Sequence, residues 1–503
     1  MRFPQPHRLT LAALLLLPLS APAALPYAIV GTHQDVCYGP LGTLPCPPMA
    51  SPWSGQDAQY RGAGPSYTDL GDGTVQDNVT GLMWVQARGP ELSWDDAKAG
   101  AKACRVGGHD DWRLPTVKEL YSLMDFRGRS GPAAADCTPY LDAAIFGFAF
   151  GDAAKGERVI DAQDWSADED LARTMGGDHS VFGVNFIDGR IKAYPKQDRR
   201  RGGLTAKYCR YVRGDPAYGR NVFVEQDDGT VLDQATGLEW SQDDSGQGMD
   251  WPMALAWAQA RAEEKYRGHD DWRLPNAKEL QSLVDYRRGP DITGGAAMDP
   301  VFHYSHITDE AGLKDYPYVW TSTTHRDNGG AVYICFGRAM GYLRPPDGGE
   351  GRWVDVHGAG AQRSDPKTGD PAAYPQGHGP QGDAIRIRNY VRLVRGGGVT
   401  AVTGEQSPAA EPPRRAPLGG EPGPGGAQAA PGAAPFAGAD AGAGDASGPA
   451  MGRRRGPPAE AISACNGHAE GDSVSFTTPR GDTLQGVCRK MGGTLFAVPA
   501  QRP

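Results

Sequence analysis

Two histidines stand in the same eight-residue string, GHDDWRLP, which occurs at residues 108–115 and again at 268–275. In each string His109 or His269 precedes two aspartates, and an imidazole beside a carboxylate can hold a polar ligand. The tryptophan and leucine of the string are typical of a core, and the proline favours an extended entry into a helix. We therefore interpret the string as architecture and keep both histidines as candidate ligand-binding residues.

The arginine of an architectural loop needs a carboxylate partner. For Arg113 the candidates are Glu119 and Asp111. Glu119 stands where a helix-capping residue is expected, so we predict that it serves the helix and is not a catalytic acid. The same interpretation applies to Glu279 after the second string.

A second group of residues has the chemistry of an anionic-sugar site. Between residues 338 and 353, arginines are interspersed with aromatic residues, and this combination suits a negatively charged sugar. Long loops on a rigid scaffold are a common place for binding. Packing in the core is the alternative for the aromatic rings. The predicted binding residues are Arg338, Arg344, Arg352 and Trp353.

Aspartates near two turns raise the alternative of calcium as a cofactor. No twelve-residue EF-hand loop is present in the sequence. We therefore interpret the aspartates as turn-forming residues, expect no cofactor, and keep calcium as the alternative. The two sets are Asp69, Asp72 and Asp77, and Asp227, Asp228 and Asp233.

These candidate residues lie on two copies of one domain. The chain carries three blocks twice, in the same order: residues 72–84 and 228–240, the GHDDWRLP strings, and residues 208–214 and 390–396. Such a recurrence indicates a tandem repeat. We place copy one at residues 67–214 and copy two at 221–397.

Each copy has the same predicted elements. Asp-Gly and Thr-Gly turns predict a β-hairpin that ends at Trp84 or Trp240. Capping patterns predict a helix before each GHDDWRLP string and another after it. Two helices against small antiparallel sheets make an α+β domain. The predicted N-caps are Ser93, Thr116, Asp250 and Asn276, and the later strands are 180–188, 208–212, 319–324, 331–336 and 390–394.

The segments outside the copies indicate export. Residues 1–23 resemble a secretory signal peptide, and no later stretch predicts a transmembrane segment. We expect a bacterial protein that is secreted, periplasmic or on the cell surface. A net charge of −9 argues against nucleic-acid binding. The other segments are an N-terminal arm at 24–66, a disordered Gly/Ala/Pro linker at 398–460 and a small disulfide-stapled module at 461–503.

Eight cysteines in an exported chain predict disulfides. Cys104 and Cys209 are both present in copy one and both replaced in copy two, which favours a bond between them. Two further pairs, Cys37 with Cys46 and Cys465 with Cys488, each lie in a short segment that has little core. Cys137 and Cys335 lie in different copies; they could bridge the copies or stay as free thiols, which we prefer.

The pattern DGTVxDxxTGLxW, GHDDWRLPxxKEL and YxRxVRG resembles the C-terminal domain family of the Legionella collagen-like adhesin. This resemblance implies a C-type-lectin-like α+β fold and an extracellular role in which a glycan or cell-surface ligand is bound. Sulfated glycans are the ligands of the founding adhesin. We therefore expect a non-catalytic, adhesive protein.

Two alternatives to adhesion remain at this level. WRLPxxxE is also similar to a stretch of formylglycine-generating enzymes, which implies an enzyme with a pair of active-site cysteines. Here Cys335 stands alone, and Asn185 is at the matching position of copy one. No G-x-S-x-G elbow and no HExxH motif occurs. The other alternative is a purely structural envelope protein.

Overall fold

The computed structural model describes residues 25–39, 42–198, 202–326, 329–345 and 349–402, and in the C-terminal part 463–465, 468–469, 471–477, 483–491 and 494–499. The chain divides into two compact units, residues 1–420 and 421–503, and the first unit holds both copies. The predicted signal peptide and most of the predicted linker lie outside the described residues. Within the described part, no helix is both long and apolar enough to cross a bilayer.

Each copy opens with the predicted hairpin. In copy one, Val75 of β5 (Thr74–Asp77) lies opposite Trp84 of β6 (Met83–Val85). In copy two, Val231 of β12 (Thr230–Asp233) lies opposite Trp240 of β13 (Leu238–Ser241). Both tryptophans are fully buried. Four-stranded sheets are completed by β4 (Tyr67–Asp69) and β10 (Val212–Arg213) in copy one, and by β11 (Phe223–Glu225) and β21 (Val394–Gly396) in copy two.

The closing strands are shorter than the predicted 208–212 and 390–394, so this part of the prediction is wrong in extent. Arg210 and Arg392 are each only 1% exposed. They turn inward and donate hydrogen bonds to backbone carbonyl oxygens near the end of the second hairpin strand of their own copy. Regular strand pairing therefore begins only after these arginines.

The helices begin where the capping patterns predict. The hydroxyl of Ser93 accepts from the backbone of α1 (Trp94–Ala103), and the carboxylate of Asp250 does so for α3 (Trp251–Glu263). Reciprocal capping boxes start the two short helices, with Thr116 and Glu119 at α2 (Val117–Ser122) and Asn276 and Glu279 at α4 (Ala277–Ser282). All four predicted N-caps are confirmed.

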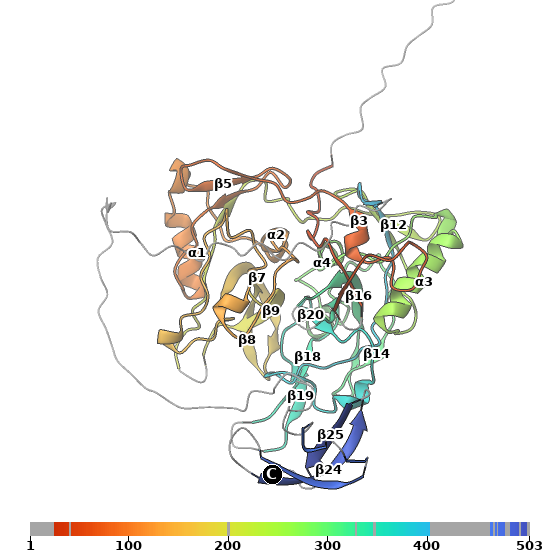
Figure 1. Cartoon of the computed structure of the whole chain (residues 1–503). Helices are drawn as coiled ribbons and strands as arrows, with labels where there is room; N and C mark the ends of the chain where they lie inside the picture. Colours follow the sequence, from red (N-terminus) through yellow and green to blue (C-terminus); the bar gives the residue numbers. More distant parts are fainter. Residues whose placement is uncertain are drawn as a thin grey trace, which may run out of the picture. The chain divides into compact units, whose positions relative to one another are not determined.

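The two copies share one antiparallel sheet of six strands. Its order is β16-β17-β20-β9-β8-β7, so the three strands of copy two continue directly into the three of copy one. The junction pairs Gln362 with Ile191. In Figure 1, α1 and α3 lie towards the two outer sides, with α2 and α4 between them. The strands are β7 (Gln163–Thr174), β8 (Asp178–Asn185), β9 (Arg190–Pro195), β16 (Tyr318–Thr324), β17 (Ala331–Cys335) and β20 (Gln362–Asp365).

Equivalent lysines cross between the copies in opposite directions. The ammonium of Lys118 donates to the Ser282 carbonyl oxygen at 2.6 Å, and that of Lys278 donates to the Ser122 carbonyl oxygen at 2.8 Å. Each carbonyl lies at the end of the other copy's short helix. The same apolar cluster contains residues of both copies, and the rings of Phe182 and Tyr286 meet in it at 4.5 Å. The copies are therefore joined by a shared core as well as a shared sheet.

The N-terminal arm packs on copy two. Trp53 lies 6.1 Å from Trp251 between ring centroids, and Gln259 exchanges hydrogen bonds with Ser54. The ammonium of Lys367 lies 4.3 Å from the Trp251 ring and donates to the Tyr38 carbonyl oxygen. The predicted Cys37–Cys46 disulfide is confirmed in this arm. It joins β1 (Cys37–Gly39) to the segment that follows β2 (Gly42–Leu44).

The predicted Cys104–Cys209 disulfide is wrong, because both residues are free thiols in this structure. Cys209 is buried and its sulfur donates to the Tyr211 hydroxyl at 3.6 Å. Burial raises the pKa of Tyr211, and the neighbouring thiols of Cys209 and Cys104 raise it further. The Cys209 thiol therefore has the Tyr211 hydroxyl as its partner. Cys335 is a buried free thiol, as we preferred.

The C-terminal unit is a small three-stranded antiparallel sheet in its described part. Its strands are β23 (Ser473–Thr477), β24 (Thr483–Met491) and β25 (Thr494–Pro499). The predicted Cys465–Cys488 disulfide is confirmed and ties the segment before the sheet to its middle strand.

Short elements complete the described chain. Strands β3 (Tyr60–Arg61) and β22 (Thr400–Ala401) pair, so the first residues of the predicted linker are ordered against the arm. The others are β14 (Ile307–Thr308), β15 (Lys314–Asp315), β18 (Met340–Leu343), β19 (Arg352–Asp355) and α5 (Pro290–Thr293). Turns of 3₁₀ helix occur at Asp57–Gln59, Val106–Gly108, Ala134–Asp136, Ala153–Lys155, Tyr266–Gly268 and Pro371–Ala373.

Because the copies share a sheet and a core, we expect them to unfold together. Trp272 is only 3% exposed, and its replacement in Trp272→Ala should lower the free energy of unfolding of the whole first unit by about 3–5 kcal/mol. All eleven tryptophans lie between residues 53 and 353, so their fluorescence reports on the first unit alone. A single thermal transition that moves as a whole is the expected result. Two transitions, only one of which moves, would show that the copies are independent.

The buried lysine of copy two should make stability depend on pH. Burial lowers the pKa of Lys278 from 10.5 to about 7. Nearby carboxylates oppose this shift, and Asp125 has the largest opposing effect. Between these values Lys278 binds more protons in the unfolded chain than in the folded chain, so this group alone should make the free energy of unfolding rise with pH by up to about 1.4 kcal/mol per unit. Urea unfolding at pH 7, 8 and 9 measures this rise. Because other buried lysines such as Lys367 and Lys118 add to the rise, Lys278→Met should reduce the slope by up to about 1.4 kcal/mol per unit without removing it, and an unchanged slope would contradict the assignment.

Candidate functional site

The GHDDWRLP loops are built as architecture in both copies. The guanidinium of Arg113 makes two hydrogen bonds to Glu119, at 2.7 and 2.5 Å, and Arg273 makes the same pair to Glu279 at 2.7 and 2.6 Å. Both glutamates are 1% exposed. The indole N–H of each tryptophan donates to a carbonyl oxygen of the preceding turn. Of the two carboxylates that we considered for Arg113, Glu119 is the partner.

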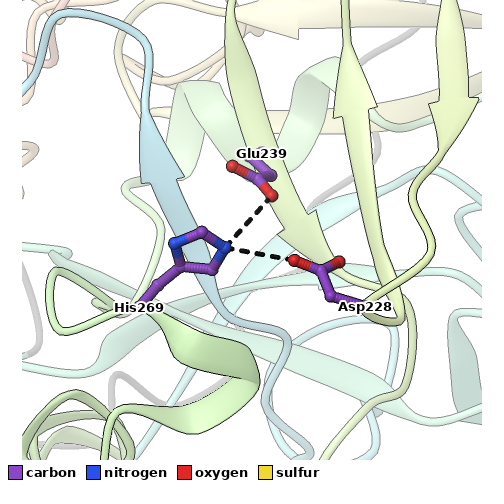
Figure 2. Close-up of side chains that lie close together, drawn as sticks. All are labelled: Asp228, Glu239 and His269. Carbon is purple, nitrogen blue, oxygen red and sulfur yellow. Dashed lines mark hydrogen bonds and ion pairs between the residues drawn. The ribbon is translucent and has the colours of Figure 1, made fainter.

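The histidine of the second loop lies in a group of three side chains that could hold a metal ion. His269 Nε2 is 3.2 Å from Asp228 Oδ2 and 3.7 Å from Glu239 Oε1 (Figure 2). Asp228 comes from the turn before β12, Glu239 from β13, and His269 from the loop after α3. The imidazole and both carboxylates point towards one another, and all three side chains are partly accessible to solvent.

Neighbouring groups hold this cluster in place. The Thr230 hydroxyl lies 2.8 Å from Asp228 Oδ1 and 2.6 Å from Glu239 Oε1. Arg395 pairs with Glu239 Oε2 and also donates to Asp271 at 2.6 Å. Partial burial acts to raise the pKa of Asp228, but hydrogen bonds from Thr230 and His269 outweigh it, and the pKa is lowered. Asp228 is therefore a carboxylate at neutral pH.

The equivalent place in copy one has only two of the three groups. Asp72 and His109 are present, but Met83 stands where copy two has Glu239. The histidine rings are placed alike, 6.1 Å from Trp112 in copy one and 6.0 Å from Trp272 in copy two between centroids. The hydrogen bond from Thr74 lowers the pKa of Asp72, and the neighbouring His109 contributes. The two copies thus differ by one ligand.

The two aspartate sets considered as an alternative calcium site do not converge in the part of the chain that the structure describes. Among the described residues, the one group of three or more His, Cys, Asp or Glu side chains that converge is Asp228, Glu239 and His269. Asp72 accepts from the backbone N–H of Thr74, and Asp77 accepts from those of the Thr-Gly turn. Asp72 and Asp77 are therefore turn-forming residues, as we preferred. Glu239 was missed by the sequence analysis, although the substitution between aligned copies could have indicated it.

The predicted anion-binding residues fall into three different surroundings. Arg338 is held in an ion-pair network, with Asp291 at 2.5 Å and Asp309 at 3.4 Å, and its side chain is only 12% exposed. The hydrogen bonds that Arg338 donates to Asp291 raise the pKa of Arg338, against the opposing effect of burial. Its guanidinium is therefore already paired with carboxylates of the protein itself. Trp353 packs on Tyr342 across the β18–β19 hairpin, 5.4 Å between ring centroids.

The other two arginines line a surface hollow of about 430 Å³ where the copies meet. Arg344 and Arg352 come from the β18–β19 hairpin of copy two, and Met175 and Gly176 from the β7–β8 turn of copy one. The Met175 N–H donates to the Asp355 carbonyl oxygen at 2.8 Å, which fixes the turn against the hairpin. The turn residues were missed, because no sequence signal links them to the hairpin. The remaining lining residues are Leu343, Pro345, Glu350 and Val354.

The cysteine considered for catalysis is inaccessible. Cys335 is fully buried in β17, and burial raises the pKa of its thiol well above the ordinary value. The thiol is therefore protonated at neutral pH. Asn185, at the matching place in β8, is also fully buried and donates to the Ile160 carbonyl oxygen at 2.8 Å.

Comparison with known proteins matches both copies to the same family. Residues 73–213 and 229–353 match the Lcl C-terminal domain, and together these stretches cover more than half of the 503 residues. The second match ends within β19, in the hairpin that carries Arg352. No curated protein and no solved structure matches the chain.

Proposed function

Since the chain belongs to the Lcl C-terminal domain family, with two copies of that domain in tandem, we propose that it is a secreted, non-catalytic protein that binds an anionic glycan. The family is of the bacterial surface-adhesin type. Beyond membership of the family, we infer that the protein is exported, that its sugar ligand carries sulfate or carboxylate groups, and that it does not catalyse a reaction. A C-type-lectin-like fold of each copy belongs to the same proposal.

The observation that carries the proposal is the hollow lined by Arg344 and Arg352. Both residues are exposed, and guanidinium groups bind sulfate and carboxylate oxygens with paired, directional hydrogen bonds. The Arg344 guanidinium donates to Gln376 at 2.5 Å, which orients it. Met175 and Leu343 supply an apolar wall, as sugar rings require on one face. Among the described residues of the lining, Glu350 is the one opposing charge, and it favours ligands whose anionic groups are well separated.

Catalysis is disfavoured by the placement of the candidate groups. Cys335 is buried and protonated, and Glu119 and Glu279 are bound to arginines in the helix caps. A nucleophile or general acid must reach its substrate within hydrogen-bond distance. These residues therefore support folding, and the accessible arginines support binding.

The double variant Arg344→Ala/Arg352→Ala tests the proposal. A charged hydrogen bond contributes about 1.5–3 kcal/mol, so we expect the affinity for a sulfated glycosaminoglycan such as heparin to fall at least about tenfold. The salt dependence of binding should also become flatter, because fewer charges are neutralised. Calorimetric titration at two salt concentrations measures both effects.

The matched control is Arg105→Ala, which removes an exposed arginine at the end of α1 and should leave binding unchanged. Melting temperatures should agree among the three proteins. Normal heparin binding by the double variant would contradict the proposed site. If a folded His109→Ala variant then lost binding, the shared GHDDWRLP loop would be the binding element.

A further inference from the structure

We propose that Asp228, Glu239 and His269 form a binding site for a divalent transition-metal ion of the Zn²⁺ type. Zinc binds imidazole nitrogen and carboxylate oxygen at about 2.0–2.2 Å in tetrahedral geometry, which places neighbouring ligand atoms about 3.3–3.6 Å apart. His269 Nε2 lies 3.2 and 3.7 Å from the two carboxylate oxygens. These two separations are therefore close to those of ligands around one ion, and all three ligand atoms lie within 4.8 Å of one another.

The ligand types select against calcium. Calcium takes six to eight oxygen ligands, whereas this cluster offers one imidazole nitrogen and two carboxylates. An imidazole with carboxylates is a donor set suited to zinc, and the fourth position would be left to water. The side chains of Asp228 and His269 are 39% and 27% exposed, so an ion can enter from solvent.

The surroundings hold the ligands in the arrangement that a metal ion needs. Arg395 binds Glu239 Oε2, which leaves Oε1 directed at His269. Thr230 bridges the two carboxylates through its hydroxyl group. Partners of this kind orient metal ligands in proteins.

The structure of copy one indicates that Glu239 is not required for folding. There the arginine equivalent to Arg395 is Arg213, which donates to Asp111 at 2.6 Å and lies 3.5 Å from the Met83 sulfur. The same strand pairing forms with methionine in place of glutamate. The ion pair between Arg395 and Glu239 is therefore not needed for the strand pairing, and the glutamate is available to complete a set of three metal ligands.

Two substitutions test the site by giving each copy the residue of the other copy at this hairpin position. In the untagged full-length chain, freed of metal by chelation, Glu239→Met should remove one equivalent of bound Zn²⁺ from a calorimetric titration. The affinity of this site should fall at least about tenfold, since even changes around metal ligands cost 10–100-fold. Met83→Glu should add one equivalent by completing the set of Asp72 and His109. Zn²⁺ should raise the melting temperature of the wild type but not of Glu239→Met.

The controls separate loss of a ligand from loss of the fold. Glu239→Met should keep the metal-free melting temperature close to that of the wild type, because copy one folds with methionine there. His269→Asn should lose the same equivalent of Zn²⁺, and His109→Asn should not. Co²⁺ bound at the site should give the visible absorption of a tetrahedral ion.

The inference is overturned if Glu239→Met and His269→Asn both bind Zn²⁺ as the wild type does. It is also overturned if the site prefers Ca²⁺ to Zn²⁺ in competition. The metal site shares no residue with the hollow of Arg344 and Arg352. Loss of heparin binding in the arginine double variant would therefore neither support nor contradict the proposed metal site.

Discussion

The fold depends on a reciprocal contact in which each copy places a lysine ammonium on the last turn of the other copy's short helix. Lys118 reaches the Ser282 carbonyl, and Lys278 reaches the Ser122 carbonyl. The C-terminal end of a helix carries unpaired carbonyl oxygens and partial negative charge, so an ammonium satisfies it well. Removing an ammonium from water is costly, and the carbonyl oxygens of the facing helix offset part of that cost while the copies stay together.

The repeated scaffold is stabilised by buried charges that each have a fixed partner. Arg273 and Glu279 are almost completely buried and form two hydrogen bonds with each other, while Glu279 also caps α4. Arg392 donates to three carbonyl oxygens beneath the hairpin. Breaking such a pair leaves an uncompensated buried charge, so these residues specify one arrangement of the loop, helix and closing strand. They account for the blocks that both copies share.

Candidate functional groups gather where the copies differ. Glu239 replaces Met83 at one hairpin position and brings a third ligand to a histidine and an aspartate that both copies possess. The β18–β19 hairpin belongs to copy two, and it meets the Met175–Gly176 turn of copy one to form the arginine-lined hollow. A duplicated scaffold can thus keep its core in both copies while one copy acquires additional surface chemistry.

Local patterns in the sequence determined the hairpins and the four helix caps, because turns and caps depend on residues a few positions apart. They also determined the repeat and its family. The same patterns narrowed the partner of Arg113 to Glu119 or Asp111, and the structure decided for Glu119. The disulfide expected between Cys104 and Cys209 failed, because the comparison of the copies could not show that the Cys209 thiol instead donates to the Tyr211 hydroxyl. The six-stranded sheet, the burial of Arg338 and the convergence of Asp228, Glu239 and His269 were decided only in three dimensions. Each of them joins residues far apart in the chain, and their meeting depends on how the copies and their loops pack.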